Sequence, residues 1–240
     1  MVTASQHIAA VPAQFLTLGG RIVRRVGRSL GASFAPRTVT FVALDISGYA
    51  QYSGDDQAEL RKRLYEGVKV LRHSVGCPIT TFGVLDRGDG VLVLLPGTVD
   101  TLRVLEDGLP ALAKKVDHDN RFKRGGSMKL RGVIHKGPAK RDKWGWVGNE
   151  VNLVFRLIDS ETLRAAQLDE KGTPVVVAMT NVIYDDALRK LGQDAQRLHN
   201  LIKRCWDREL GERDFKVKET ERRAWVAAVG GQQVSVPVNN

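Results

Sequence analysis

Cysteine is scarce in this chain. Its 240 residues include only two, Cys77 and Cys205, which lie far apart in the sequence. This count argues against a disulfide scaffold and against a cysteine-built zinc site, and it suits a reducing cytosol. No stretch approaches the roughly 18 apolar residues of a membrane span, and no charged segment followed by an apolar one opens the sequence, as in a secretory signal. We therefore expect a cytoplasmic protein with no stable membrane insertion.

Acidic residues are absent from residues 1–44, which hold five arginines and supply half of the formal net charge of +10. A second basic concentration is residues 113–143, with eleven Lys or Arg side chains against three Asp. Such a stretch fits a phosphate-bearing small ligand as well as a polynucleotide. Aromatic residues make up only 6% of the chain, whereas nucleic-acid-binding proteins present an aromatic-studded sheet or a basic recognition helix. We therefore expect no nucleic-acid partner.

The apolar residues that are present follow clear periods. The β-branched segment 38–44 predicts a buried strand that ends at Asp45. Leucine and valine at helical spacing over residues 60–75 predict an amphipathic helix with Asp55 and Asp56 at its N-cap. Two short apolar runs, 79–85 and 90–95, then predict a β-hairpin.

The second half of the chain continues the mixture of strands and helices. A helix is expected over residues 102–116, bent or divided by Pro110. The other predicted elements are strands over 129–134, 144–147 and 174–179, helices over 151–158 and 182–191, and two strands between 215 and 229. This order predicts an α+β sandwich, in which helices cover a mainly antiparallel sheet.

Two carboxylates lie at the ends of predicted strands. Asp45 follows the first strand, and Asp89 lies in the hairpin turn 44 residues later. Each has a structural explanation by itself, because Asp at a strand end forms an Asx-turn and Asp before Gly is common in hairpin turns. An α+β sheet can also bring the two turns side by side, and converging carboxylates could hold two divalent cations about 4 Å apart. Oxygen ligands of this kind suit Mg²⁺ or Mn²⁺.

Asn152 and Arg156 form a second candidate pair. They are four residues apart, so a helix would place them on one face. An amide and a guanidinium aimed together can bind ribose and phosphate oxygens. A solvated arginine beside an ordinary asparagine on a helix face is the alternative interpretation.

Four segments together resemble the class III nucleotidyl cyclase catalytic domain, over roughly residues 38–190. They are Asp45-Ile46-Ser47-Gly48-Tyr49, Gly88-Asp89-Gly90, Leu130-Arg131-Gly132-Val133-Ile134-His135-Lys136-Gly137, and Gly148 with Val151-Asn152 and Arg156-Leu157. The family shows an Asp-Ile-x-Gly-aromatic segment, a Gly-Asp turn about 44 residues later, a strand ending in a small-residue turn, and an Asn-x-x-x-Arg helix. The resemblance implies that the α+β fold is cyclase-like (ferredoxin-like).

The resemblance also divides the chain. Residues 36–200 would form the nucleotidyl cyclase catalytic domain. Outside it, we expect residues 1–35 to be a basic extension with an amphipathic helix over 18–30. Residues 201–240 would be a strand-rich extension that packs on the same domain.

For function, the resemblance implies a homodimer with composite active sites and a nucleoside triphosphate as substrate. Asp45, the backbone carbonyl of Ile46 and Asp89 of one subunit would bind two divalent cations, Mg²⁺ or Mn²⁺. Asn152 and Arg156 of the other subunit would complete the pocket. Arg156 would stabilise the charge that grows at the α-phosphate, and Asn152 would fix the ribose.

The residues at the base-reading positions differ from those of purine cyclases. In adenylate cyclases of this class, a Lys three residues before the Gly of the Gly-Asp turn and an Asp seven before the helix Asn read the adenine. Those positions hold Leu85 and Gly145 here, and the guanylate-type pair is missing as well. Bulky Tyr49, Trp144 and Trp146 lie nearby in sequence. We therefore expect a narrower nucleotide-binding pocket, for a one-ring base.

A short domain with these departures is similar to the bacterial pyrimidine cyclases of Pycsar-type anti-phage defence. In those systems a uridylate or cytidylate cyclase makes cUMP or cCMP, which activates an effector. We expect UTP rather than CTP as the substrate. One alternative is an adenylate or guanylate cyclase. Another is a catalytically inactive, cyclase-like nucleotide-binding module, which the presence of both carboxylates and Arg156 argues against.

Overall fold

The computed structural model describes residues 35–122, 126–143, 145–169, 172–206, 210–217 and 220–230. The helix expected over residues 18–30 and the side chain of Trp144 lie outside the described residues. Among the described residues, no helix combines the length and the apolar character needed to cross a bilayer.

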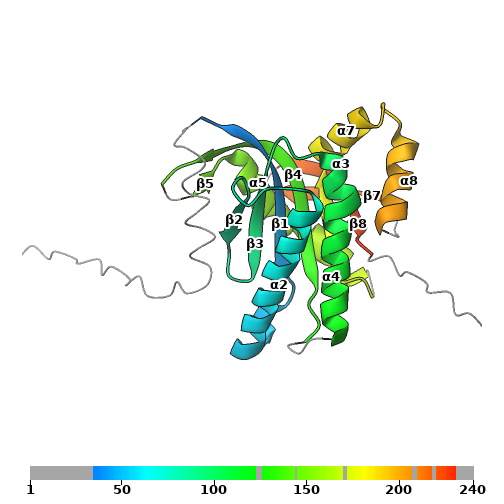
Figure 1. The fold of residues 1–240 in the computed structure, drawn as a ribbon. Coiled ribbons are helices and arrows are strands. Elements are labelled where there is room, and N and C mark those ends of the chain that lie inside the picture. The colour runs from blue at the N-terminus through cyan, green and yellow to red at the C-terminus, as the bar shows by residue number, and fades with distance from the viewer. Residues whose placement is uncertain are drawn as a thin grey trace, which may run out of the picture.

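One mixed sheet runs through the described part of the chain (Figure 1). Its strands are β1 (Arg37–Ile46), β2 (Gly83–Asp86), β3 (Gly90–Pro96), β4 (Leu130–Arg141), β5 (Trp146–Val147), β6 (Val175–Thr180), β7 (Gly211–Val217) and β8 (Thr220–Ala228). The spatial order is β2-β3-β1-β4-β6-β8-β7, and β5 pairs with the C-terminal end of β4. Every pairing is antiparallel except that between β4 and β6. The predicted α+β architecture with a mainly antiparallel sheet is confirmed.

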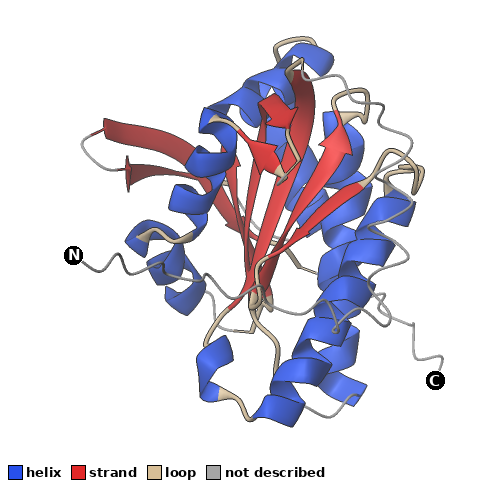
Figure 2. Ribbon diagram, turned by 90° about the vertical axis from the view of Figure 1, so that its left-hand side faces the viewer, coloured by secondary structure: helices blue, strands red, loops and turns tan. Residues whose placement is uncertain are grey.

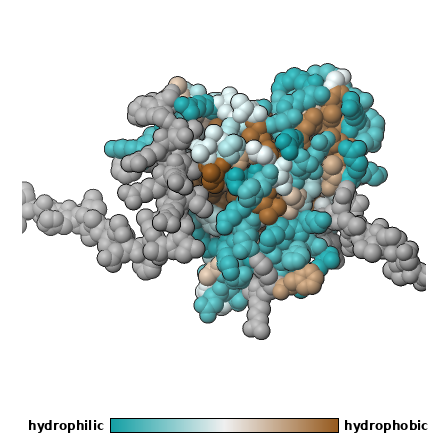
Figure 3. Space-filling model, in the orientation of Figure 1, coloured by the Kyte–Doolittle hydropathy of each residue, from teal (hydrophilic) through white to brown (hydrophobic). Residues whose placement is uncertain are grey.

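Helices cover both faces of this sheet, as Figure 2 shows. They are α2 (Gly54–Ser74), the short α3 (Thr101–Arg103), α4 (Leu109–Phe122), α5 (Asn149–Ile158), α6 (Glu161–Asp169), α7 (Asn181–Lys190) and α8 (Ala195–Trp206), with a 3-10 turn η1 (Tyr49–Gln51) and a π-helical turn η2 (Val104–Gly108). One core lies between the sheet and α2, α4, α7 and α8. The other lies between the sheet and α5 and α6. The outer surfaces of α2 and α4 are mostly hydrophilic (Figure 3).

The start of α2 differs from the expectation. Ser53, not Asp55 or Asp56, is the N-cap, and its hydroxyl accepts a hydrogen bond from the backbone N–H of Asp56 at 3.3 Å. Both aspartates lie instead in the first turn of the helix. Their negative charge is favourable there because the exposed N–H groups give this end a partial positive charge.

The expected division near Pro110 is confirmed, in the form of a π-helical turn. The backbone N–H of Leu109 reaches back five residues to the carbonyl of Val104, where η2 meets α4. Pro110 has no backbone N–H, so it can occupy the start of α4 at no cost in helical hydrogen bonds.

Two helices have no counterpart in the sequence prediction. The helix α6 buries Leu163, Ala166 and Gln167 over nine residues. The helix α8 runs across residue 200 and ends at Trp206, whose indole N–H donates to the carbonyl of Leu105 at 2.8 Å. Beyond it, β8 pairs with β6, so the last described strands belong to the same sheet.

Candidate active site

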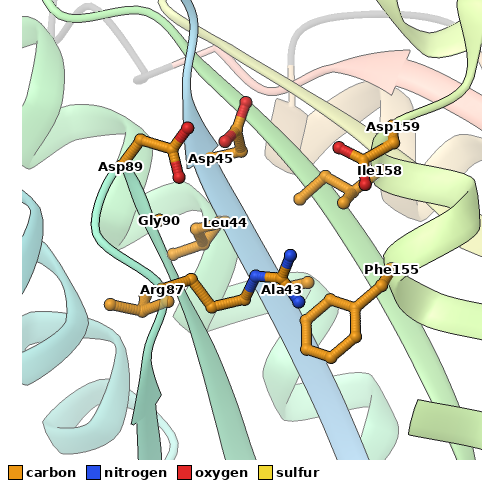
Figure 4. A pocket seen from close by; sticks show the side chains of 10 residues that line it. Ala43, Leu44, Asp45, Arg87, Asp89, Gly90, Phe155, Ile158 and Asp159 are labelled. Carbon is orange, nitrogen blue, oxygen red and sulfur yellow. The ribbon is translucent and has the colours of Figure 1, made fainter. Parts of the chain in front are cut away.

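Asp45 lies near the end of β1, the strand between β3 and β4. In the register of the sheet it is opposite Gly90 of β3 and Arg131 of β4. The next residue, Ile46, donates its backbone N–H to the carbonyl of Asp89 at 2.9 Å. This bond joins the end of β1 to the hairpin turn, so Asp45 and Asp89 line one pocket (Figure 4).

The hairpin turn approaches β1 closely because Gly90 has no side chain. A Cβ at this position would lie 2.5 Å from the carbonyl oxygen of Leu44 and 3.2 Å from the Cα of Asp45. The turn is also held from α2. The guanidinium of Arg61 pairs with Asp86 and hydrogen-bonds the carbonyl of Gly88. Asp89 therefore has a defined position although its side chain is exposed.

The pocket opens between the hairpin, the end of β1 and α5. Its lining residues are Ala43, Leu44, Asp45, Arg87, Asp89, Gly90, Val91, Phe155, Ile158 and Asp159. The guanidinium carbon of Arg87 lies 3.8 Å from the centre of the Phe155 ring, which is a cation–π contact (Figure 4). The pocket thus combines three carboxylates with one cation stacked on an aromatic ring.

Asp45 is the least exposed of these three acids. Burial raises the pKa of its carboxyl, and the negative charges of Asp89 and Asp159 act in the same direction. Arg131 opposes this by donating a hydrogen bond to the carboxylate and by its charge, but it does not cancel the effect of burial. Additional positive charge in the pocket would therefore stabilise the ionised form of Asp45.

The residues of the pocket suit divalent cations that are coordinated partly by the protein and partly by a bound ligand. Among the described residues, no group of three or more His, Cys, Asp or Glu side chains could by itself enclose a metal ion. Two carboxylates in an open pocket form an incomplete ligand set, and Mg²⁺ is usually bound by one or two carboxylates together with substrate phosphates and water. Asp45 and Asp89, with the carbonyl of Ile46, are the residues that would hold such ions.

Asn152 and Arg156 do not join Asp45 and Asp89 in this pocket. Both lie on α5, as predicted, and both are exposed. Neither lines the pocket, and Arg156 makes no ion pair with any residue in the described ranges. One chain therefore brings together only the carboxylate half of the predicted site.

The three predicted base-reading residues also lie in different places. Leu85 is partly buried and packs against the core that lies between the sheet and α5 and α6. Gly145 lies in a turn between β4 and β5 with φ of 145°, where no atom outside its chain neighbours lies within 4 Å of a built Cβ. Tyr49 packs on the other core, and its hydroxyl donates to the carbonyl of Gln57 at 3.4 Å. None of the three lines the pocket of Asp45 and Asp89.

Sequence reasoning assigned no role in the site to Arg87, Phe155 or Asp159, or to Arg131 as the partner of Asp45. A signal existed for Arg87, which lies inside the turn that carries Asp89. Phe155 and Asp159 line the pocket only because α5 packs across β1, and Arg131 meets Asp45 only because β4 pairs with β1 in one particular register.

No protein-family model matches the chain, and no curated protein matches its sequence. Solved structures are similar in fold. The guanylyl cyclase Cya2 has a TM-score of 0.55 at 15% identity, over 85% of this chain and 96% of that one. A bacterial light-regulated adenylyl cyclase has a TM-score of 0.54 at 11% identity, over 86% of this chain and 56% of that one. An adenylate/guanylate cyclase/hydrolase from Silicibacter pomeroyi has a TM-score of 0.50 at 14% identity, over 80% and 95%.

These similarities define the fold as that of class III adenylyl and guanylyl cyclase domains, which confirms the expected fold class. The identities are too low to carry more than the fold, because one fold can hold sites of different chemistry. Function has to be argued from the residues of the pocket.

Proposed function

We propose that this protein is a nucleotidyl cyclase, which converts a nucleoside triphosphate to its 3′,5′-cyclic monophosphate and pyrophosphate. The observation that carries the proposal is the convergence of Asp45 and Asp89 in one open pocket at the end of β1. Both carboxylates would bind the cations that accompany the triphosphate. Two divalent cations, Mg²⁺ or Mn²⁺, would lower the pKa of the substrate's 3′-hydroxyl and neutralise charge on the phosphates.

The reaction is intramolecular, so the residues mainly hold the nucleotide in the attack geometry. The 3′-oxygen forms a bond to the α-phosphorus, the bond from this phosphorus to the bridging oxygen breaks, and the hydroxyl proton leaves to solvent. Arg156 would stabilise the charge at the α-phosphate, and Asn152 would fix the ribose.

We propose further that the site is composite and that the protein acts as a homodimer. Asn152 and Arg156 lie on the exposed face of α5, outside their own chain's pocket. Exposed side chains of this kind can serve a pocket on a second copy. Part-buried apolar side chains on the same side of the sheet, Leu85, Trp146, Leu153 and Phe155, supply apolar surface for that contact.

For the base, we propose a pyrimidine, with UTP favoured over CTP. Leu85 and Gly145 do not line the pocket of Asp45 and Asp89, but by the resemblance they stand at the purine-reading positions, and neither offers a side-chain hydrogen bond to a purine edge. A polar group that is buried without a partner costs about 1–3 kcal/mol. Two such groups, together with crowding by a bulky aromatic side chain, would disfavour ATP and GTP by a factor on the order of 10³ or more. The stacked side chains of Arg87 and Phe155 both line the pocket, which also favours a smaller base.

The rival is an adenylate or guanylate cyclase, and the names of the similar solved structures favour it. A second alternative is not an enzyme but a catalytically inactive, cyclase-like nucleotide-binding module. If the proposed product is cUMP or cCMP, its role would be that of a second messenger in anti-phage defence, made in the cytoplasm.

One assay separates these functions. Purified protein is incubated with all four nucleoside triphosphates in equal amounts and Mn²⁺, and the products are identified by mass spectrometry. We expect a cyclic pyrimidine monophosphate as the main product, with purine products near background. Dominant cAMP or cGMP would reject the pyrimidine assignment and keep the cyclase. No cyclic product, together with saturable binding of a nucleotide, would support the inactive module.

A further inference from the structure

A buried hydrogen-bonded chain connects the sheet to the first turn of α5. His135 of β4 is 3% exposed, and its Nε2 lies 2.7 Å from Oε2 of Glu150, in the first turn of α5. Its Nδ1 lies 2.9 Å from the hydroxyl of Thr180, the last residue of β6. The imidazole ring also stacks on Phe41 of β1, with 12° between the ring planes.

These contacts match one tautomer of the neutral ring. Burial lowers the pKa of His135, although Glu150 opposes the shift, and a lowered pKa favours the neutral ring. A carboxylate only accepts hydrogen bonds, so Nε2–H of His135 donates to Glu150, and Nδ1 accepts from the hydroxyl of Thr180. Both ring nitrogens then have hydrogen-bond partners. The ring belongs to β4, stacks on Phe41 of β1 and contacts Thr180 of β6, so three strands set its orientation.

Gly137 of β4 leaves space for the His135–Glu150 contact because it has no side chain. A Cβ on Gly137 would lie 2.8 Å from Cγ of Glu150 and 3.2 Å from Nε2 of His135. Any larger residue at this position would push Glu150 away from the histidine. The close approach of α5 to β4 therefore depends on Gly137 and on the His135–Glu150 pair together.

The buried side chain of Val151 also anchors the first turn of α5, but this helix has no side-chain cap. Gly148 is its N-cap and provides no side-chain hydrogen bond. Glu150 is two residues from Asn152 and six from Arg156, and all three belong to the same ten-residue helix. A carboxylate anchored at the start of this helix sets where the two exposed side chains project.

We infer that Glu150 is a positioning residue, which His135 holds so that α5 presents Asn152 and Arg156 in a fixed place. The inference rests on the proposed cyclase function, in which these two residues serve the ribose and the α-phosphate. The cation-binding carboxylates Asp45 and Asp89 do not depend on this contact. Loss of the contact should therefore slow the chemical step more than it weakens nucleotide binding.

The test compares Glu150→Ala, Glu150→Gln and Gly137→Ala with the wild type. A glutamine can still accept the hydrogen bond from His135 through its amide oxygen. Glu150→Gln should therefore keep the position of α5 and the turnover of the wild type. Glu161→Ala is the matched control, because Glu161 is an exposed acid in the first turn of α6. Two readouts are taken on protein whose folded fraction is measured: steady-state kcat and KM, and amide hydrogen exchange over Asn149–Ile158.

For Glu150→Ala and Gly137→Ala we expect kcat per folded protein to fall at least about tenfold, KM to change by less than about threefold, and exchange in α5 to accelerate. Glu150→Gln and Glu161→Ala should remain near the wild type in both readouts. Unchanged kcat in the alanine variants, or a loss of activity that only matches a loss of folded protein, would overturn the inference.

Failure of the proposed function has a different signature. A wild-type protein that forms no cyclic nucleotide would reject the cyclase and with it the catalytic consequence of the pair. Hydrogen exchange would still decide whether Glu150 anchors α5. Unchanged exchange in both alanine variants would reject the anchor itself.

Discussion

Arg131 lies directly opposite Asp45 in the register of β4 and β1, and its guanidinium donates a hydrogen bond to the Asp45 carboxylate. Both side chains are nearly buried, at 12% and 15% exposure. Arg131 therefore keeps Asp45 in place at the edge of the pocket and supplies part of the positive charge that its ionised form needs. The first prediction concerns this carboxylate.

Asp45→Asn and Asp89→Ala should each lower cyclase turnover by more than about a hundredfold, because even residues that only support metal ligands cost 10- to 100-fold when replaced. The fold should survive both changes. Asn keeps the shape of Asp45 and can still accept from Arg131, and Asp89 is exposed in a turn. The measurement is kcat together with a thermal unfolding curve, and Asp55→Asn on α2 is the control. Substantial turnover in either variant would reject the cation-binding assignment.

If each active site is built from both subunits, two inactive variants should restore activity when they are combined in one dimer. Asp45→Ala and Arg156→Ala should each be inactive, but a heterodimer of the two has one site with both halves intact. Co-expressed with different affinity tags and purified as a heterodimer, the pair should recover up to about half of the wild-type activity per dimer. A verified heterodimer without activity would mean that each chain builds its own site. As a control, a chain with both changes should not rescue either single variant.

Arg87 should matter for substrate binding. It is the cation that lines the pocket beside three carboxylates, and it is held over the ring of Phe155. Arg87→Ala should raise the KM for the nucleoside triphosphate about tenfold or more, since a charge-assisted hydrogen bond contributes about 1.5–3 kcal/mol. Arg164→Ala, at an exposed position on α6, is the matched control. Equal KM values for the two variants would show that Arg87 does not contact the nucleotide.

Gly90→Ala should destabilise the protein. The added methyl would meet the backbone of Leu44 at 2.5 Å, and a rigid strand cannot move aside as a flexible side chain would. We expect a loss of about 1–3 kcal/mol in the free energy of unfolding, measured by urea denaturation. At Gly54, in the first turn of α2, a Cβ meets nothing within 4 Å. Gly54→Ala should therefore be neutral, and an equal loss in both variants would contradict the steric argument.

Asp186 on α7 should contribute stability that depends on pH. Burial by itself would raise the pKa of Asp186, but hydrogen bonds from Thr101, Lys136 and Arg189 outweigh burial and lower the pKa to about 2, from an ordinary value of 3.8. The ionised form is thus favoured in the native state, and its contribution is present above pH 3.8 and lost as the pH falls through 2.

The corresponding variant is Asp186→Asn, which should lose about 1–2 kcal/mol of stability at pH 7. The difference from the wild type should shrink steadily below about pH 4. Asp185→Asn, its exposed neighbour, should show no such dependence. A difference between Asp186→Asn and wild type that stays constant from pH 7 to pH 3 would contradict the assignment.

Local patterns determined much of the fold. The strand β1, the hairpin of β2 and β3, and the helices α2 and α5 follow from hydrophobic period and turn residues within a few positions of one another. The helices α6 and α8 were missed for different reasons. The nine residues of α6 bury only three side chains, which is a weak period, whereas α8 carries Leu198, Leu201, Ile202 and Trp206 at helical spacing, so the sequence did contain its signal.

The sequence by itself was enough to select the two carboxylates and the Asn152–Arg156 pair as candidate site residues, because residue type, spacing and order can be read from it directly. Only the tertiary structure decided which side chains meet. The partnership of Asp45 with Arg131 depends on strand register, and the contact of Arg87 with Phe155 depends on how α5 crosses the sheet. The same packing left Asn152 and Arg156 exposed, because an α-helix that buries one stripe must present the opposite one outward.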